Sequence, residues 1–166
     1  RDERGRNFVD GAAGVVLYKI LSLLGFITIA WSIPRIARKL SADPAVALWL
    51  GVANPVIILH LIGGMHNESL MVGLVSIGLL AALHKRFHAA LLLVGTAVAM
   101  KATAVIAAPF IVWMMLHHYA PKGSSKWRQL AVFVLSGIAA VAEIIAAVAL
   151  ITWISGTSWG WLSPVS

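Results

Sequence analysis

The sequence contains no cysteine and few charged residues, and both shortages narrow the classes of protein to which it can belong. The absence of cysteine excludes disulfide bonds and leaves the redox compartment unspecified. Charged residues make up only 11% of the chain and hydrophobic residues 60%, whereas average soluble domains are roughly 25% charged and about half apolar. Because the hydrophobic residues form long runs, the sequence predicts a membrane protein and not a soluble domain.

The charge that is present has one predominant sign, with a formal net charge of +7 at pH 7. The excess lies in short loops between apolar segments, whereas a nucleic-acid binder would collect it on one polar face. We therefore expect no nucleic-acid partner, and we interpret the basic loops as signals of membrane orientation. The chain starts at Arg1 without methionine and stops at Ser166 in a turn-like sequence, so we expect it to be a piece of a longer protein.

The apolar segments predict an all-α fold, a polytopic transmembrane helical bundle with about four full spans and one broken, re-entrant helix pair. Pro34 is expected to end the first span, and Asn54-Pro55 is expected to kink the second. The transmembrane core is predicted over residues 12–154, with segments at 12–33, 45–63, 70–83, 89–100 with 102–116, and 130–154.

Cytoplasmic loops collect Lys and Arg, so the basic loops at 34–44 and 84–88 are expected inside and the segment at 63–69 outside. Residues 89–116 would make a helix of about 42 Å, too long for an upright span. A reversal at Lys101 also keeps the basic loop before residue 130 inside. Residues 1–11 are then an extracytoplasmic stretch, and 155–166 begin an extracytoplasmic loop. Tryptophans are expected at both membrane interfaces, as is usual in membrane proteins. The inner interface would hold Trp31, Trp49, Trp113 and Trp127, and the outer interface Trp153.

The most unusual stretch is Gly63-Gly64-Met65-His66-Asn67-Glu68, on the predicted outer side. Two glycines permit a sharp turn, and a base, an amide and an acid follow at a predicted helix start. His66 and Glu68 are candidate catalytic residues, and Asn67 is a candidate for binding substrate. The alternative is a helix cap, with Asn67 capping and Glu68 in the first turn.

Lys101 is an ionisable residue within an apolar segment, where a charge usually faces a cavity and marks a site. An ammonium pairs with phosphate as a point charge, so a lipid-linked phosphate is the expected ligand; snorkelling to the interface is the alternative. Trp159 and Trp161 anchor the chain at the interface or stack on a sugar ring. Glu143, in mid-span, is expected either to be protonated or to pair with an intramembrane cation such as Lys19.

A metal site is not expected. His60, His66 and Glu68 carry ligand chemistry, but their spacing does not match a helical zinc motif. No cofactor is predicted either.

The segment NPVIILHLIGGMHNESLMVGL, residues 54–74, resembles the actinobacterial polyprenol-phosphate-mannose-dependent α-(1→6)-mannosyltransferases of the GT-C superfamily. The preceding IAWSIPRIARKLSADPAVALWLG and the closing SWGW are also similar to this family, so the resemblance covers nearly the whole chain from Ala12 onward. From His66 to Pro109 and Phe110 the layout is also similar to that of eukaryotic lipid-linked-sugar glucosyltransferases.

The resemblance implies a membrane glycosyltransferase that moves mannose from polyprenyl-phosphate mannose to an α-(1→6)-mannan glycolipid, in lipomannan or lipoarabinomannan assembly. It implies inverting transfer on the outer face of the plasma membrane, with donor, acceptor, membrane lipid and the rest of the full-length chain as partners. Family members usually carry a catalytic acid in the first outer loop, and only Asp2, Glu3 or Asp10 is available here for that part.

Two other functions fit the same sequence features. Broken helices and intramembrane ionisable residues also occur in transporters, so a flippase of a lipid-linked sugar is one alternative. A non-catalytic membrane subunit, with the polar turn as structure only, is the other.

Overall fold

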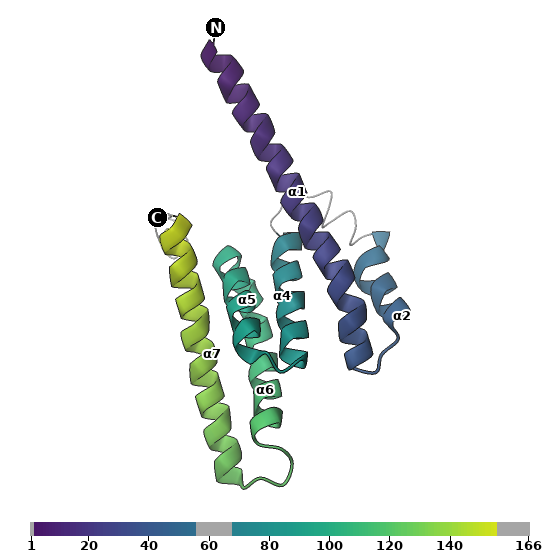
Figure 1. The fold of residues 1–166 in the computed structure, drawn as a ribbon, viewed down its shortest axis with the longest axis vertical. Coiled ribbons are helices and arrows are strands. Elements are labelled where there is room, and N and C mark those ends of the chain that lie inside the picture. Colours follow the sequence, from purple (N-terminus) through teal and green to yellow (C-terminus); the bar gives the residue numbers. More distant parts are fainter. Residues whose placement is uncertain (1, 56–67, 156–166) are drawn as a thin grey trace. The chain divides into compact units, whose positions relative to one another are not determined.

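The computed structural model describes residues 2–55 and 68–155, and the described part of the chain contains helices and no strand (Figure 1). The prediction of an all-α membrane fold is thereby confirmed. The elements in chain order are α1 (Asp2–Lys39), α2 (Pro44–Leu48), η1 (Trp49–Ala53), α4 (Glu68–Leu83), α5 (Phe87–Met100), η2 (Ala102–Ala107), α6 (Ala108–Tyr119) and α7 (Lys126–Ser155).

The chain divides into two compact units, Arg1–Ser76 and Ile77–Ser166. In the first unit, α1 continues through Pro34 to Lys39, so the expectation that Pro34 ends this helix is wrong. A proline removes a single backbone N–H, and helices in apolar surroundings tolerate this loss when other groups supply hydrogen bonds. Next to it, Arg35 Nη1 donates to the carbonyl of Trp31 over 2.7 Å, and its guanidinium lies 3.8 Å from the centre of the Trp31 ring.

After α1 the chain turns back, and α2 packs against the end of α1. Asp43 caps α2, with its Oδ1 accepting the N–H of Ala45 at 2.7 Å and that of Val46 at 3.2 Å. η1 is a π-helix that ends at Ala53, and Asn54 is extended with φ −63° and ψ 126°. The predicted interruption of the second apolar segment at Asn54-Pro55 is therefore present.

Two glycines bring α1 and the start of α4 into close contact within the first unit. A Cβ on Gly25 would lie 2.5 Å from the carbonyl carbon of Ser69 and 2.5 Å from the backbone nitrogen of Leu70. A Cβ on Gly73 would lie 3.0 Å from the carbonyl oxygen of Gly25. Small residues let membrane helices approach through their backbones. Gly25 thereby lets α1 lie directly against the backbone of Ser69 and Leu70.

In the second unit, α5 is the central helix, because Ala90, Leu91, Val94 and Ala97 are fully buried. Its neighbours approach through small residues in the same way. A Cβ on Gly78 of α4 would lie 3.1 Å from Val94, and a Cβ on Gly95 would lie 2.6 Å from the Cβ of Ala147 in α7.

The chain reverses between α5 and α6, so that η2 and α6 run back along α5 (Figure 1). At the other end of this hairpin, the ring of Phe87 lies 5.5 Å from His118 and 5.8 Å from Tyr119, between ring centroids. Lys101 lies at the reversal in extended conformation, with φ −154° and ψ 122°. The predicted break of this segment into a helix pair at Lys101 is present.

Three helical stretches of the described residues are long and apolar enough to cross a membrane: Gly14–Lys39, Ala102–Tyr119 and Lys126–Ile154. The α7 helix has 30 residues, or about 45 Å at 1.5 Å per residue, and exceeds a hydrocarbon core of ~30 Å. Trp127 and Trp153 near its ends are each 81% exposed. They lie about 39 Å apart along the axis, close to the thickness of a bilayer with its headgroup regions, as interfacial tryptophans do.

Candidate functional site

Glu68 is the first residue of α4 that the structure describes. The residue is partly buried and takes part in an interaction within the protein. The next residue, Ser69, is fully buried and its Oγ finds no hydrogen-bond partner in the described part of the chain.

The remaining residues of the polar turn lie outside the described part of the chain. They include His66 and Asn67, together with His60 before them, and the same holds for Trp159 and Trp161 near the end of the sequence. The catalytic role of His66 and the binding roles of Asn67, Trp159 and Trp161 stay predictions from the sequence.

Lys101 is held where α5 ends and η2 begins. Its N–H donates to the carbonyl of Ala97 at 3.0 Å, and its own carbonyl accepts the N–H of Ala104 at 3.1 Å. The backbone is therefore anchored on both sides of the break, while the residue is exposed and takes part in a further interaction within the protein. A 3-10 helix directly after an extended residue is the kind of irregularity that often marks a functional position.

The two described candidates belong to different units, Glu68 to the first and Lys101 to the second. The structure thus defines the surroundings of each candidate by itself. Glu68 lies in a turn packed against Gly25 of α1, and Lys101 lies at the tip of the α5–α6 hairpin.

Glu143 has a hydrogen-bond partner in the structure, His88 at the start of α5, which is exposed and differs from the intramembrane cation that the sequence predicts. His88 Nδ1 lies 2.6 Å from Glu143 Oε1. The other oxygen, Oε2, is buried without a hydrogen-bond partner in the described structure. Lys19 was named from the sequence as an example of a cation, but the HKRFH turn supplied the partner.

The described residues hold no group of three or more His, Cys, Asp or Glu side chains that could bind a metal ion. The expectation of a metal-free and cofactor-free site remains a prediction from the sequence, because two of the histidines it concerns, His60 and His66, are not described.

Comparisons with known proteins agree on one family. The family model described as "Alpha-(1->6)-mannopyranosyltransferase, N-terminal domain" matches residues 7–117. An α-(1→6)-mannopyranosyltransferase A from Corynebacterium glutamicum is 55% identical over 161 residues, covering 92% of this chain and 33% of the relative. A protein of the same name from Mycobacterium tuberculosis is 35% identical, covering 98% of this chain and 30% of the relative. The α-(1→6)-mannopyranosyltransferase B of Corynebacterium glutamicum is 30% identical, covering 90% of this chain and 27% of the relative.

The chain thus spans about a third of the length of the curated relatives it matches. No solved structure matches it.

Proposed function

Since the chain belongs to the α-(1→6)-mannopyranosyltransferase family, we propose that the full-length protein is a membrane mannosyltransferase that forms α-(1→6) linkages. The donor is polyprenyl-phosphate mannose and the acceptor an α-(1→6)-mannan glycolipid of lipomannan or lipoarabinomannan. The observation that carries this proposal is the match of the family over residues 7–117, which includes the whole polar turn and Lys101.

The reaction requires one bond to form and one to break. The 6-hydroxyl of the acceptor attacks the anomeric carbon of a β-linked donor, and the bond from that carbon to the phosphate oxygen breaks. The product is α-linked, so the configuration inverts, and polyprenyl phosphate leaves. A base must take the hydroxyl proton, and a cation must stabilise the charge on the departing phosphate.

Four polar residues suit these tasks by their chemistry. Glu68 or His66 accepts the proton from the acceptor hydroxyl, while Asn67 holds sugar hydroxyls. Lys101 binds the phosphate as a point charge. The exposure of Lys101 at a hairpin tip supports this role, since an intramembrane cation there can meet a ligand from outside the helix pair. Trp159 and Trp161 offer flat faces for a sugar ring.

We place the site on the outer face of the plasma membrane. The basis is the distribution of Lys and Arg, which assigns the HKR turn at residues 84–86 and the basic loop before α7 to the cytoplasm. In the second unit the Lys101 reversal lies at the opposite end of the α5–α6 hairpin from Phe87 and Tyr119, which agrees with a site on the opposite side.

The test is mannosyl transfer by the full-length protein in sealed membrane vesicles of defined orientation, supplied with polyprenyl-phosphate mannose and a short α-(1→6)-mannoside. The proposal expects a product extended by one α-(1→6)-linked mannose, formed only where the acceptor reaches the outer face. A β-linked product would contradict inversion. Transfer only to acceptor on the cytoplasmic face would contradict the orientation.

The same vesicles distinguish the two alternatives. A flippase would move the donor lipid across the bilayer without forming a glycoside, and its full-length chain would show paired repeats. A non-catalytic subunit would do neither alone but would restore transfer to a separate catalytic chain.

A further inference from the structure

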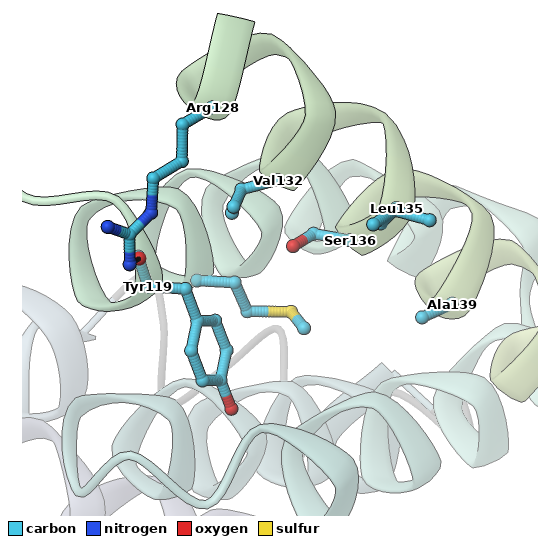
Figure 2. A pocket seen from close by; sticks show the side chains of 7 residues that line it. Tyr119, Arg128, Val132, Leu135, Ser136 and Ala139 are labelled. Atoms are coloured by element: carbon cyan, nitrogen blue, oxygen red, sulfur yellow. Dashed lines mark hydrogen bonds between the residues drawn. The ribbon is translucent and has the colours of Figure 1, made fainter. Parts of the chain in front are cut away.

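A second feature of the chain lies away from Glu68 and Lys101, in an open pocket between α6 and α7 (Figure 2). The pocket has a volume of about 440 Å³. Met115 and Tyr119 of α6 form one side, and Val132, Leu135 and Ala139 of α7 form the other. These walls are almost entirely apolar.

Besides the hydroxyl of Tyr119, the pocket is lined by two polar side chains, Arg128 and Ser136. Arg128 lies at one end, where its Nη2 donates to the carbonyl of Tyr119 over 3.2 Å (Figure 2). That bond uses one of the five N–H groups of a guanidinium. Ser136, about two turns further along α7, is buried and lines the pocket. The pocket therefore combines a cationic end with an apolar body.

The position of the pocket along α7 corresponds to the boundary between headgroups and hydrocarbon. Trp127, next to Arg128, is 81% exposed and marks an interface. From Arg128 to Ala139 the helix rises about 16 Å, which carries the pocket from headgroup level into the hydrocarbon region.

The charge near the pocket has one sign. Lys122 in the loop before α7 and Lys126 at the start of α7 are both exposed, and residues 117–128 contain no acidic residue. Anionic ligands are attracted to such a segment, and basic pockets between membrane helices on the cytoplasmic side bind anionic lipid headgroups.

We propose that the α6–α7 pocket binds an anionic phospholipid of the inner leaflet. The lipid phosphate lies on the guanidinium of Arg128, and one acyl chain lies against Val132, Leu135 and Met115. The hydroxyl of Ser136 is placed for a hydrogen bond to the glycerol ester region. This site is independent of the mannosyl transfer site, and the ligand is a component of the surrounding membrane.

The experiment uses purified full-length protein in phosphatidylcholine nanodiscs that contain a minor fraction of phosphatidylglycerol with a photoreactive acyl chain. Cross-linked peptides are mapped by mass spectrometry. The wild type is expected to be labelled within residues 111–119 and 131–140, and a photoreactive phosphatidylcholine is expected to label these peptides far less.

Two variants separate charge from shape. Arg128→Gln is expected to lower labelling about tenfold, since a hydrogen bond between charged groups contributes about 1.5 kcal/mol or more. Lys122→Gln removes the same charge from the loop outside the pocket and serves as its control.

Ala139→Leu fills the pocket without changing charge and is expected to abolish labelling there. Gly137→Leu adds bulk two residues away, where a Cβ meets nothing within 4 Å, and is expected to leave labelling intact.

Several outcomes would overturn the proposal. Equal labelling by the two lipids would show that the headgroup is not recognised. An equal loss of labelling in Lys122→Gln and Arg128→Gln would show that the lipid responds to the total positive charge of the region and not to Arg128 in the pocket. Cross-links from these peptides to another part of the full-length chain, with no lipid adduct, would show that protein fills the pocket. Thermal unfolding of each variant in the same nanodiscs confirms that the compared proteins are folded.

Discussion

Gly25 of α1 lies directly against the backbone of Ser69, the second residue of α4. A Cβ at position 25 would lie 2.5 Å from the carbonyl carbon of Ser69 and 2.6 Å from its carbonyl oxygen. The contacting atoms belong to the backbone, so no side-chain rotation can relieve the clash. Any side chain at position 25 must move the turn that carries Glu68.

Gly25→Ala is therefore expected to lower mannosyl transfer by the full-length protein by about ten- to a hundredfold, because displacement of a catalytic group by ~1 Å costs up to a hundredfold. The loss should fall mainly on kcat. Gly14→Ala is the matched control, since it lies in the same helix and a Cβ there meets nothing within 4 Å. Both changes raise helix propensity alike. Equal activity of the two variants would mean that Gly25 does not position the turn.

Lys101→Ala is expected to raise the KM for polyprenyl-phosphate mannose about tenfold or more, because the phosphate loses its cationic partner. Lys101→Arg keeps the charge and should recover part of the affinity. Lys39→Ala, at the end of α1, removes a lysine that the site does not use. Donor affinity unchanged in Lys101→Ala would exclude Lys101 from phosphate binding.

The 2.6 Å contact between His88 and Glu143 joins α5 to α7 and should contribute to stability. Polar pairs between membrane helices contribute about 0.6 kcal/mol on average and up to ~1.7 kcal/mol. Unfolding of wild type, His88→Ala, Glu143→Ala and the double variant in detergent forms a double-mutant cycle. We expect a coupling free energy in this range. Strict additivity of the two single changes would show that the pair does not hold the helices together.

Much of the helix pattern was predictable from the sequence because apolar runs, prolines and charges report on local structure. The interruptions at Asn54-Pro55 and at Lys101 follow from a proline and from a charge within apolar sequence, and both are present. The same reasoning gave a wrong prediction at Pro34, because one missing N–H does not end a helix in apolar surroundings.

The contacts between helices were not predictable in the same way. Nothing local distinguishes Gly25, which lies against α4, from Gly14, which meets nothing within 4 Å. The partner of Glu143 lies 55 residues away in sequence, and the choice of His88 depends on how α5 packs against α7. Motif chemistry identified Glu68 and Lys101 as candidates, but not the helix contacts that position them.

We propose that residues 63–68 form the catalytic site of the full-length mannosyltransferase. The most direct test compares transfer from polyprenyl-phosphate mannose to a short α-(1→6)-mannoside by full-length wild type, His66→Ala and Glu68→Gln at equal expression. Glu143→Gln, which keeps a hydrogen-bonding group at a carboxylate outside the turn, is the control. Wild type and control are expected to transfer mannose, and the variants at His66 and Glu68 are expected to lose about 10²- to 10⁴-fold in rate, the usual contribution of general acid–base catalysis. Wild-type rates in both of these variants, or movement of the donor lipid across the bilayer without any glycoside formed by the wild type, would contradict the proposal.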